Sequence, residues 1–264
     1  MSVAGNIAAL SPLAELASLD LGDTDVAGDI GALASLVGLR VLDLTRTKVA
    51  GQVEDLAALE DLKFLDLRQT GVTGDVVALA SLVNLVFLDI SHTSVGGAIT
   101  HMAPLLQLTH LDMGFTEVAG DVKGLMALVE LTFVNLRMTE VAGDVYALAP
   151  LVRLTWLDLL YTRMTARDVG ALAPLVELAY LNLGSAGAGM AGDIKGLAPL
   201  VQLKTLDVSN TEVMGDIGAL APLVQLSSIE LGGTNIRGLY CHYALSIVVM
   251  HRGSLSETEQ YEAE

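Results

Sequence analysis

Residues 192–214 read Gly-Asp-Ile-Lys-Gly-Leu-Ala-Pro-Leu-Val-Gln-Leu-Lys-Thr-Leu-Asp-Val-Ser-Asn-Thr-Glu-Val-Met, and units of this 23-residue pattern follow one another along the chain. Ten copies begin at Gly5, Gly28, Gly51, Gly74, Gly97, Gly120, Gly143, Arg167, Gly192 and Gly215. An extra residue at Ala166 and a longer glycine-rich segment at 184–190 interrupt the period. A repeat of this length is typical of a solenoid, in which each turn packs only against its neighbours.

The apolar spacing inside one unit predicts its local structure. Apolar residues occupy positions 3, 6, 9, 12, 15, 17 and 22 of the unit. The steps of three favour a 3-10 segment, because residues three apart share a face there. The single step of two predicts a short strand with positions 15 and 17 pointing inward. All six prolines stand at position 8, where a sheet ladder would need a backbone donor. Each turn is therefore predicted to hold one strand and one non-strand return.

The segment 203–213, Leu-Lys-Thr-Leu-Asp-Val-Ser-Asn-Thr-Glu-Val, resembles the leucine-rich-repeat motif Leu-x-x-Leu-x-Leu-x-x-Asn-x-Leu. The Leu-Asp-Leu core followed by Gly-x-Ile is closest to the plant-type subclass, and the resemblance runs from residue 3 to about residue 237. It implies an α/β solenoid: an arc with a concave parallel sheet of about ten strands and short 3-10 or irregular segments on the convex side.

One position departs from the family pattern. Thr replaces the ladder Asn in nine of the ten units, at Thr24, Thr47, Thr70, Thr93, Thr116, Thr139, Thr162, Thr211 and Thr234. In the family this Asn bonds backbone groups inside the turn. A Thr hydroxyl donates a single hydrogen bond, so we expect a thinner ladder of side-chain bonds.

The repeat pattern also sets the domain boundaries. Residues 1–237 are predicted to form the solenoid, 238–252 a C-terminal helical cap and 253–264 an acidic tail. The cap is suggested by apolar residues that share one helical face at Leu239, Tyr243, Ile247 and Met250. Val3 enters the pattern in the middle of a unit, so we expect another chain or a missing segment to cover the open N-terminal strand edge.

Composition excludes several classes of partner. The net charge of −17 argues against nucleic acid and anionic membrane surfaces, because phosphate binding needs clustered Lys and Arg. No apolar run reaches the length of a membrane span. Cys241 is the single cysteine and no signal peptide is visible, so we expect the cytoplasm or another reducing intracellular compartment.

The candidate binding residues lie where the predicted strands face outward. Position 14 carries a ring in the six middle units, at Phe64, Phe87, His110, Phe133, Trp156 and Tyr180. Beyond the strand, positions 18 and 19 add Phe115, Arg137, Met138, Leu160 and Tyr161. Exposed rings gathered on one surface mark interaction sites. The alternative is that rings on neighbouring strands pair only to stabilise the sheet.

Acidic residues form a second outward-facing row. Position 16 is Asp in most units, including Asp89, Asp112 and Asp158 in the middle of the chain. Parallel strands would place these carboxylates about 5 Å apart. Such a negative strip would attract a basic partner and speed its docking. Asp also belongs to the plant-type motif, so the row can equally be part of the framework.

These features predict a non-enzymatic protein–protein interaction or scaffold module, without a cofactor. Its partner would be a basic protein or peptide with apolar anchors, bound on the concave face through a central aromatic patch flanked by the Asp row. The alternative is a carbohydrate-binding solenoid, with sugars stacked on the same rings. A metal or acid–base site around His92, His110, Asp89 and Asp112 is disfavoured, because Asp recurs in nearly every unit and no second shell converges there.

Overall fold

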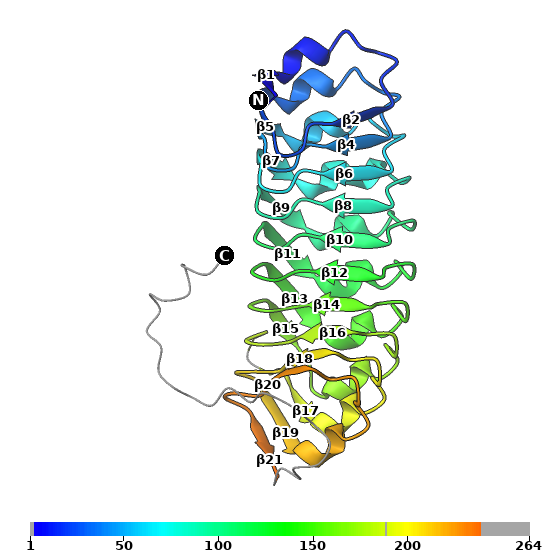
Figure 1. Cartoon of the computed structure of the whole chain (residues 1–264). Helices are drawn as coiled ribbons and strands as arrows, with labels where there is room; N and C mark the ends of the chain where they lie inside the picture. The colour runs from blue at the N-terminus through cyan, green and yellow to red at the C-terminus, as the bar shows by residue number, and fades with distance from the viewer. Residues whose placement is uncertain (1–2, 188, 239–264) are drawn as a thin grey trace.

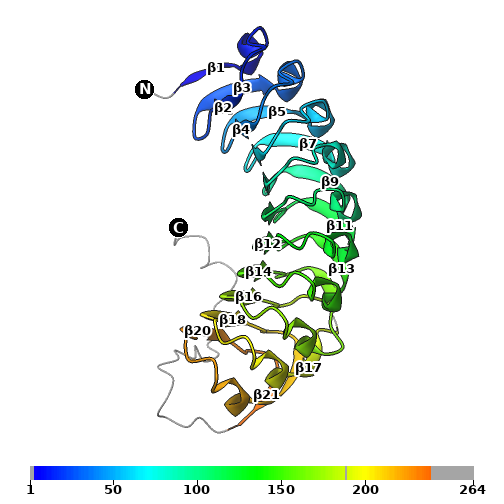
Figure 2. The same cartoon turned by 90° about the vertical axis from the view of Figure 1, so that its right-hand side faces the viewer.

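Each turn of the chain contributes a three-residue strand to one continuous parallel sheet. The computed structural model describes residues 3–187 and 189–238, and within them this sheet has ten strands in chain order. They are β2 (Ser18–Asp20), β4 (Val41–Asp43), β6 (Phe64–Asp66), β8 (Phe87–Asp89), β10 (His110–Asp112), β12 (Phe133–Asn135), β14 (Trp156–Asp158), β16 (Tyr180–Asn182), β18 (Thr205–Asp207) and β20 (Ser228–Glu230). Equivalent residues of successive turns are paired, as in His110 with Phe133. The chain forms an arc with this sheet on its inner side (Figures 1 and 2), which confirms the predicted fold.

A second parallel sheet was not expected, so the prediction of one strand per turn is wrong. Eight of its strands form one sheet: β1 (Ala4–Asn6), β3 (Asp25–Asp29), β5 (Lys48–Gln52), β7 (Gly71–Asp75), β9 (Ser94–Ala98), β11 (Glu117–Asp121), β13 (Glu140–Asp144) and β15 (Arg163–Thr165). Beyond the longer segment at 184–190, β17 (Ala191–Asp193), β19 (Glu212–Asp216) and β21 (Asn235–Arg237) pair separately. The glycine at position 1 allows most of these strands to pass through a positive φ, such as +114° at Gly143.

The convex side is built from 3-10 helices, as the steps of three predicted. They are η1 (Ile7–Leu10), η2 (Ile30–Leu33), η3 (Val53–Leu56), η4 (Val76–Ser81), η5 (Ile99–Met102), η6 (Val122–Leu125), η7 (Val145–Leu148), η8 (Val169–Leu172), η9 (Ile194–Leu197) and η10 (Ile217–Leu220). In most turns an Asp at position 2 caps the helix; the Asp121 carboxylate, for example, accepts a bond from the Lys123 N–H at 2.9 Å. The predicted cap and tail, and Cys241, lie outside the described residues except for Gly238.

The core between the sheets and the helices is aliphatic. Leu, Ile, Val and Met fill the inward positions of every turn, and no buried core residue of the described chain is aromatic. The Thr column closes each turn: the Thr93 and Thr139 hydroxyls donate to the Ile90 and Leu136 carbonyl oxygens, each at 2.6 Å. These bonds stay within their own turn, so the Thr residues of this position do not link neighbouring turns.

The 3-10 helices η5 and η6 pack closely against each other at Gly124, which allows a prediction for this residue. A Cβ atom at Gly124 would lie 2.5 Å from the Thr100 Cα atom of the preceding turn. We expect Gly124→Ala to lower the free energy of unfolding by about 1–3 kcal/mol, because η5 and η6 would have to move apart. Urea denaturation measures the effect. Gly38→Ala is the control, since no atom lies within 4 Å of its Cβ position; equal effects at the two sites would contradict the steric argument.

Candidate functional site

The six rings at position 14 form one continuous stack across the concave sheet, which we call the aromatic ladder: Phe64, Phe87, His110, Phe133, Trp156 and Tyr180. Successive ring centroids lie 4.3, 4.2, 4.1, 5.6 and 3.6 Å apart, with interplanar angles of 17° or less. Each ring is half-buried, because its neighbours cover its faces and leave its edges toward the concave side. The rings therefore stabilise the sheet and also present an apolar surface to a partner.

A second row of side chains lies just past the strands. His92, Phe115, Met138 and Tyr161, at position 19, all have a positive φ between 54° and 56°. Position 19 also has a positive φ in other turns, for example at Asp23 and Asn210, so this conformation belongs to the repeat and sets the direction of the whole row. Met138 and Tyr161 are 44% and 56% exposed, so the row offers apolar anchors beside the ladder.

Arg137 and Leu160 lie between the two rows, in the turn after the strands. The Arg137 guanidinium is 4.9 Å from the centre of the Phe115 ring, a cation–π contact. Its Nε atom is buried and has no hydrogen-bond partner among the described residues. Leu160 is half-buried. The structure thus brings the predicted aromatic, Met, Leu and Arg residues onto one surface.

The Asp row differs from the predicted negative strip in the middle of the sheet. Asp89 and Asp158 are each only 2% exposed. Their carboxylates fold back and accept the backbone N–H groups of Ser91 and Leu160 at 2.8 and 3.0 Å. Asp112 is half-buried and accepts the Gly114 N–H at 2.9 Å. The prediction of an exposed negative strip is therefore wrong at these turns. The carboxylates are used instead as acceptors for the backbone N–H groups of the turn that follows each strand.

Burial also changes the charge of this row. It raises the pKa of Asp89 to about 7, and the nearby Asp112 and Asp66 charges act in the same direction. Burial likewise raises the pKa of Asp112 and of Asp158. Arg68, which is not among the predicted site residues, lies 3.8 Å from both Asp66 and Asp89. The centre of the row is consequently less negative than the sequence suggested.

His110 and His92 both stack against aromatic rings. His110 stands between Phe87 and Phe133 in the ladder, and burial lowers its pKa to about 4. His92 stacks on Phe115 with centroids 4.2 Å apart. Within residues 3–187 and 189–238, no group of three His, Cys, Asp or Glu side chains could hold a metal ion.

A polar cluster at one end of the ladder was missed by the sequence reasoning. The Tyr180 hydroxyl donates to the Asp158 carboxylate at 3.3 Å and accepts from the Asn182 amide at 3.4 Å. These contacts fix the ring against Trp156. Tyr180, Asp158 and Asn182 stand on neighbouring strands at positions 14 and 16, but only knowledge of the register could have paired them.

The stacked turns, the concave parallel sheet and the 3-10 convex side define a leucine-rich-repeat solenoid. A plant peptide hormone receptor, RGFR1 in complex with RGF2, is similar at 24% identity and a TM-score of 0.75, over 90% of this chain and 43% of that one. An internalin (inlF) from Listeria monocytogenes is similar at 22% identity and a TM-score of 0.73, over 93% of this chain and 77% of that one. A plant ice-binding protein is similar at 22% identity and a TM-score of 0.69, over 83% of this chain and 72% of that one.

These likenesses establish the fold. The chain spans less than half the length of the plant receptors it matches, 43% in the case of RGFR1. No protein-family model matches the chain, and no curated protein matches it. No described helix is long and apolar enough to cross a membrane.

Proposed function

We propose that the chain is a non-enzymatic interaction module that binds a peptide, or an extended segment of a protein, across the aromatic ladder. The observation that carries the proposal is the pair of apolar rows: six stacked rings on one side, and Phe115, Met138 and Tyr161 on the other. Aromatic and Met side chains are enriched at the cores of interfaces. Two structural neighbours are plant receptors solved with peptide ligands, RGF2 and IDA, which supports a peptide partner.

The charges favour a basic peptide with apolar anchors. The protein carries a net charge of −17. The exposed Glu117 follows the second row on β11, and the exposed Glu140 on β13 forms an ion pair with Arg163. Such a field accelerates the docking of a positive partner. The Arg137 side chain makes no hydrogen bond with the described residues, and we expect its terminal Nη groups, not its buried Nε atom, to donate to a carbonyl oxygen of the bound peptide. The single cysteine supports a reducing compartment as part of this proposal.

Sugar stacking fits the same rings less well. A sugar that stacks on an aromatic residue needs a free ring face. Inside the ladder, both faces of Phe87, His110, Phe133 and Trp156 are covered by neighbouring rings. The geometry therefore favours a partner that contacts ring edges and the exposed side chains of the second row.

The proposal predicts a loss of affinity when a side chain of either row, the aromatic ladder or the second row, is truncated. A random peptide library selected on the full chain supplies the ligand, and calorimetry gives the dissociation constant. We expect Trp156→Ala and Met138→Ala each to weaken binding at least tenfold, about 1.4 kcal/mol. Circular dichroism checks that the variants keep the fold.

The control is Tyr146→Ala. Tyr146 is a 71% exposed ring on the convex helix η7, so its removal should leave the affinity unchanged. Binding that survives Trp156→Ala and Met138→Ala, or that is lost equally with Tyr146→Ala, would refute the assignment of the concave surface.

A further inference from the structure

An exposed aliphatic column runs along one flank of the solenoid, on the loops that lead into the concave sheet. It stands at position 10, and we call it the valine column: Val37, Val83, Leu106, Val129, Val152, Val176, Val201 and Val224. Ala14 and Glu60 take this position in turns one and three, so the column is unbroken from turn four to turn ten. Its members are 41–81% exposed. In the turns that carry the column, the Leu residues at positions 9 and 12, on either side of it, are buried, so the column lies outside the core. This flank faces the viewer in Figure 2.

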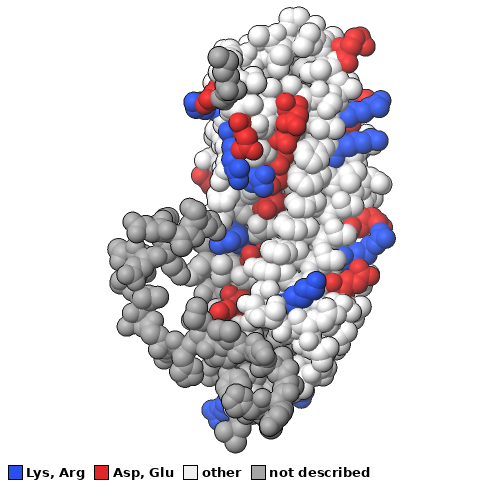
Figure 3. Space-filling model, viewed as in Figure 1, with Lys and Arg blue, Asp and Glu red and all other residues white. Residues whose placement is uncertain are grey.

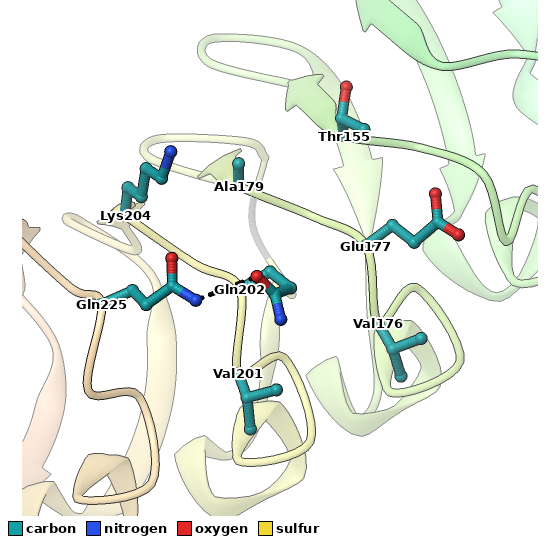
Figure 4. A pocket seen from close by; sticks show the side chains of 8 residues that line it. All are labelled: Thr155, Val176, Glu177, Ala179, Val201, Gln202, Lys204 and Gln225. Carbon is teal, nitrogen blue, oxygen red and sulfur yellow. Dashed lines mark hydrogen bonds between the residues drawn. The ribbon is translucent and has the colours of Figure 1, made fainter.

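The column continues into shallow apolar grooves between successive turns. Val86, Leu106, Thr109 and Val129 line one such groove. Figure 4 shows another, where Val176 and Val201 lie below Ala179 and the polar side chains of Glu177, Gln202, Lys204 and Gln225. Exposed aliphatic side chains that repeat in a contiguous line mark a protein interface.

The charges on this flank indicate which partner fits. At positions 11 and 13, turns one to three carry Glu15, Arg40 and Asp61, and turns seven to nine carry Arg153, Glu177 and Lys204. The signs are minus, plus, minus in the first group and plus, minus, plus in the second. Turn three also carries Glu60 at position 10 and Lys63 at position 13, so with Asp61 the net charge of this turn on the flank is negative. Two charged groups separated by an uncharged stretch are visible along the right-hand edge in Figure 3.

If a second copy of the chain is placed antiparallel to the first, with turn five opposite turn five, the charges of the two copies are complementary. This arrangement brings turn one against turn nine, turn two against turn eight, and turn three against turn seven, and every pair has opposite signs. A shift by one turn in either direction opposes like charges instead, such as Glu15 with Glu177 or Arg40 with Lys204. In turn six, Glu130 would face the uncharged turn four of the second copy. Glu130 forms an ion pair with Arg153 of its own chain, so in the pairing Arg153 would lie between Glu130 and the Asp61 of the second copy.

We infer that two copies of this chain pair flank to flank and antiparallel, around a two-fold axis at Leu106. A symmetric pair of this kind uses the same surface twice. Nine turns with three outward positions each fall within the roughly 20–30 residues a side that stable interfaces contain. The two-fold axis lies along a radius of the arc. The concave faces of the two copies therefore open on the same side of the dimer. The pairing does not depend on the peptide-binding proposal.

Sedimentation equilibrium of the full chain tests the pairing. We expect a dimer for the wild-type chain, and at least a tenfold weaker one for Leu106→Arg, because each new cation would meet its own symmetry mate. Val224→Arg is the matched control. It makes a similar aliphatic-to-Arg change in the same column, but turn ten has no counterpart in the pairing.

A charge exchange tests the antiparallel register. Glu177→Arg should weaken the dimer at least tenfold by opposing Arg40 of the partner, and Arg40→Glu in the same chain should restore it. Neither side chain forms an ion pair with the described residues of its own chain. A wild-type chain that sediments as a monomer at every concentration overturns the inference. So does a double variant as weak as Glu177→Arg alone, or an equal loss with Val224→Arg.

Discussion

Leu128→Ala is expected to lower the free energy of unfolding by about 2–5 kcal/mol, whereas Met126→Ala, two residues away, should change it by less than about 0.5 kcal/mol. Leu128 is fully buried and Met126 is 49% exposed in the same turn. The difference arises because a buried Leu leaves a cavity as well as losing its own burial. Each turn packs mainly on its two neighbours, so no distant element can fill the gap.

Urea denaturation followed by circular dichroism measures both variants. A solenoid is stabilised by contacts between neighbouring turns, and a weakened layer near the middle can uncouple the two halves. Leu128→Ala should therefore broaden the transition or divide it in two, while Met126→Ala keeps the wild-type shape. A small and equal effect of both substitutions would contradict the view that Leu128 joins one continuous core.

The repeat made the core and the concave sheet predictable. The step of two at Leu206 and Val208 sets a strand, and the steps of three set the 3-10 segments, because both periods follow from backbone geometry alone. The ring stack was predictable for the same reason: a fixed period places Phe87, His110 and Phe133 on adjacent strands. Only the distances between the stacked rings had to come from the structure.

The second sheet and the burial of the Asp row could not be predicted from the repeat pattern. Positions 21–23 alternate over only three residues, as in Glu140-Val141-Ala142, which is too short to distinguish a strand from a turn. Asp89 ends a three-residue strand, so the following turn decides where its side chain points. The alternation rule places it outward, but the bond from the Ser91 N–H folds it beneath neighbouring side chains.

The burial of Asp89 should make stability depend on pH. Its folded pKa is about 7, above the ordinary value of 3.8, so the folded state holds the proton more tightly than the unfolded state. Between about pH 4 and about pH 7 the unfolded chain has lost this proton and the folded chain keeps it. Asp89 therefore lowers the free energy of unfolding as the pH rises through this window, and its contribution is constant above it. The raised pKa values of Asp112 and Asp158 add slopes of the same sign. His110 acts in the opposite direction: burial lowers its pKa from 6.5 to about 4, so its contribution raises the free energy of unfolding between about pH 4 and about pH 6.5.

Asp89→Asn should remove the Asp89 contribution to the pH dependence. It should stabilise the protein at about pH 8 by on the order of 4 kcal/mol, since the pKa of Asp89 rises from 3.8 to about 7 and each pKa unit corresponds to about 1.4 kcal/mol. The amide oxygen can still accept the Ser91 N–H, because Asn135 and Asn182 accept the equivalent bonds from Arg137 and Gly184 at 3.1 and 2.9 Å. Urea titrations at about pH 4 and about pH 8 measure the change.

Asp20→Asn is the matched control for this prediction. Asp20 occupies the same position of the first turn and accepts the Gly22 N–H at 3.1 Å, but it is exposed. Its replacement should leave the wild-type pH profile in place, because water already solvates that carboxylate in the folded chain. If Asp89→Asn gained no stability at about pH 8 relative to about pH 4, the Asp89 carboxylate would be solvated too. The rings and loops above it would then be open to water, and the concave surface would be looser than the one on which the binding proposal rests.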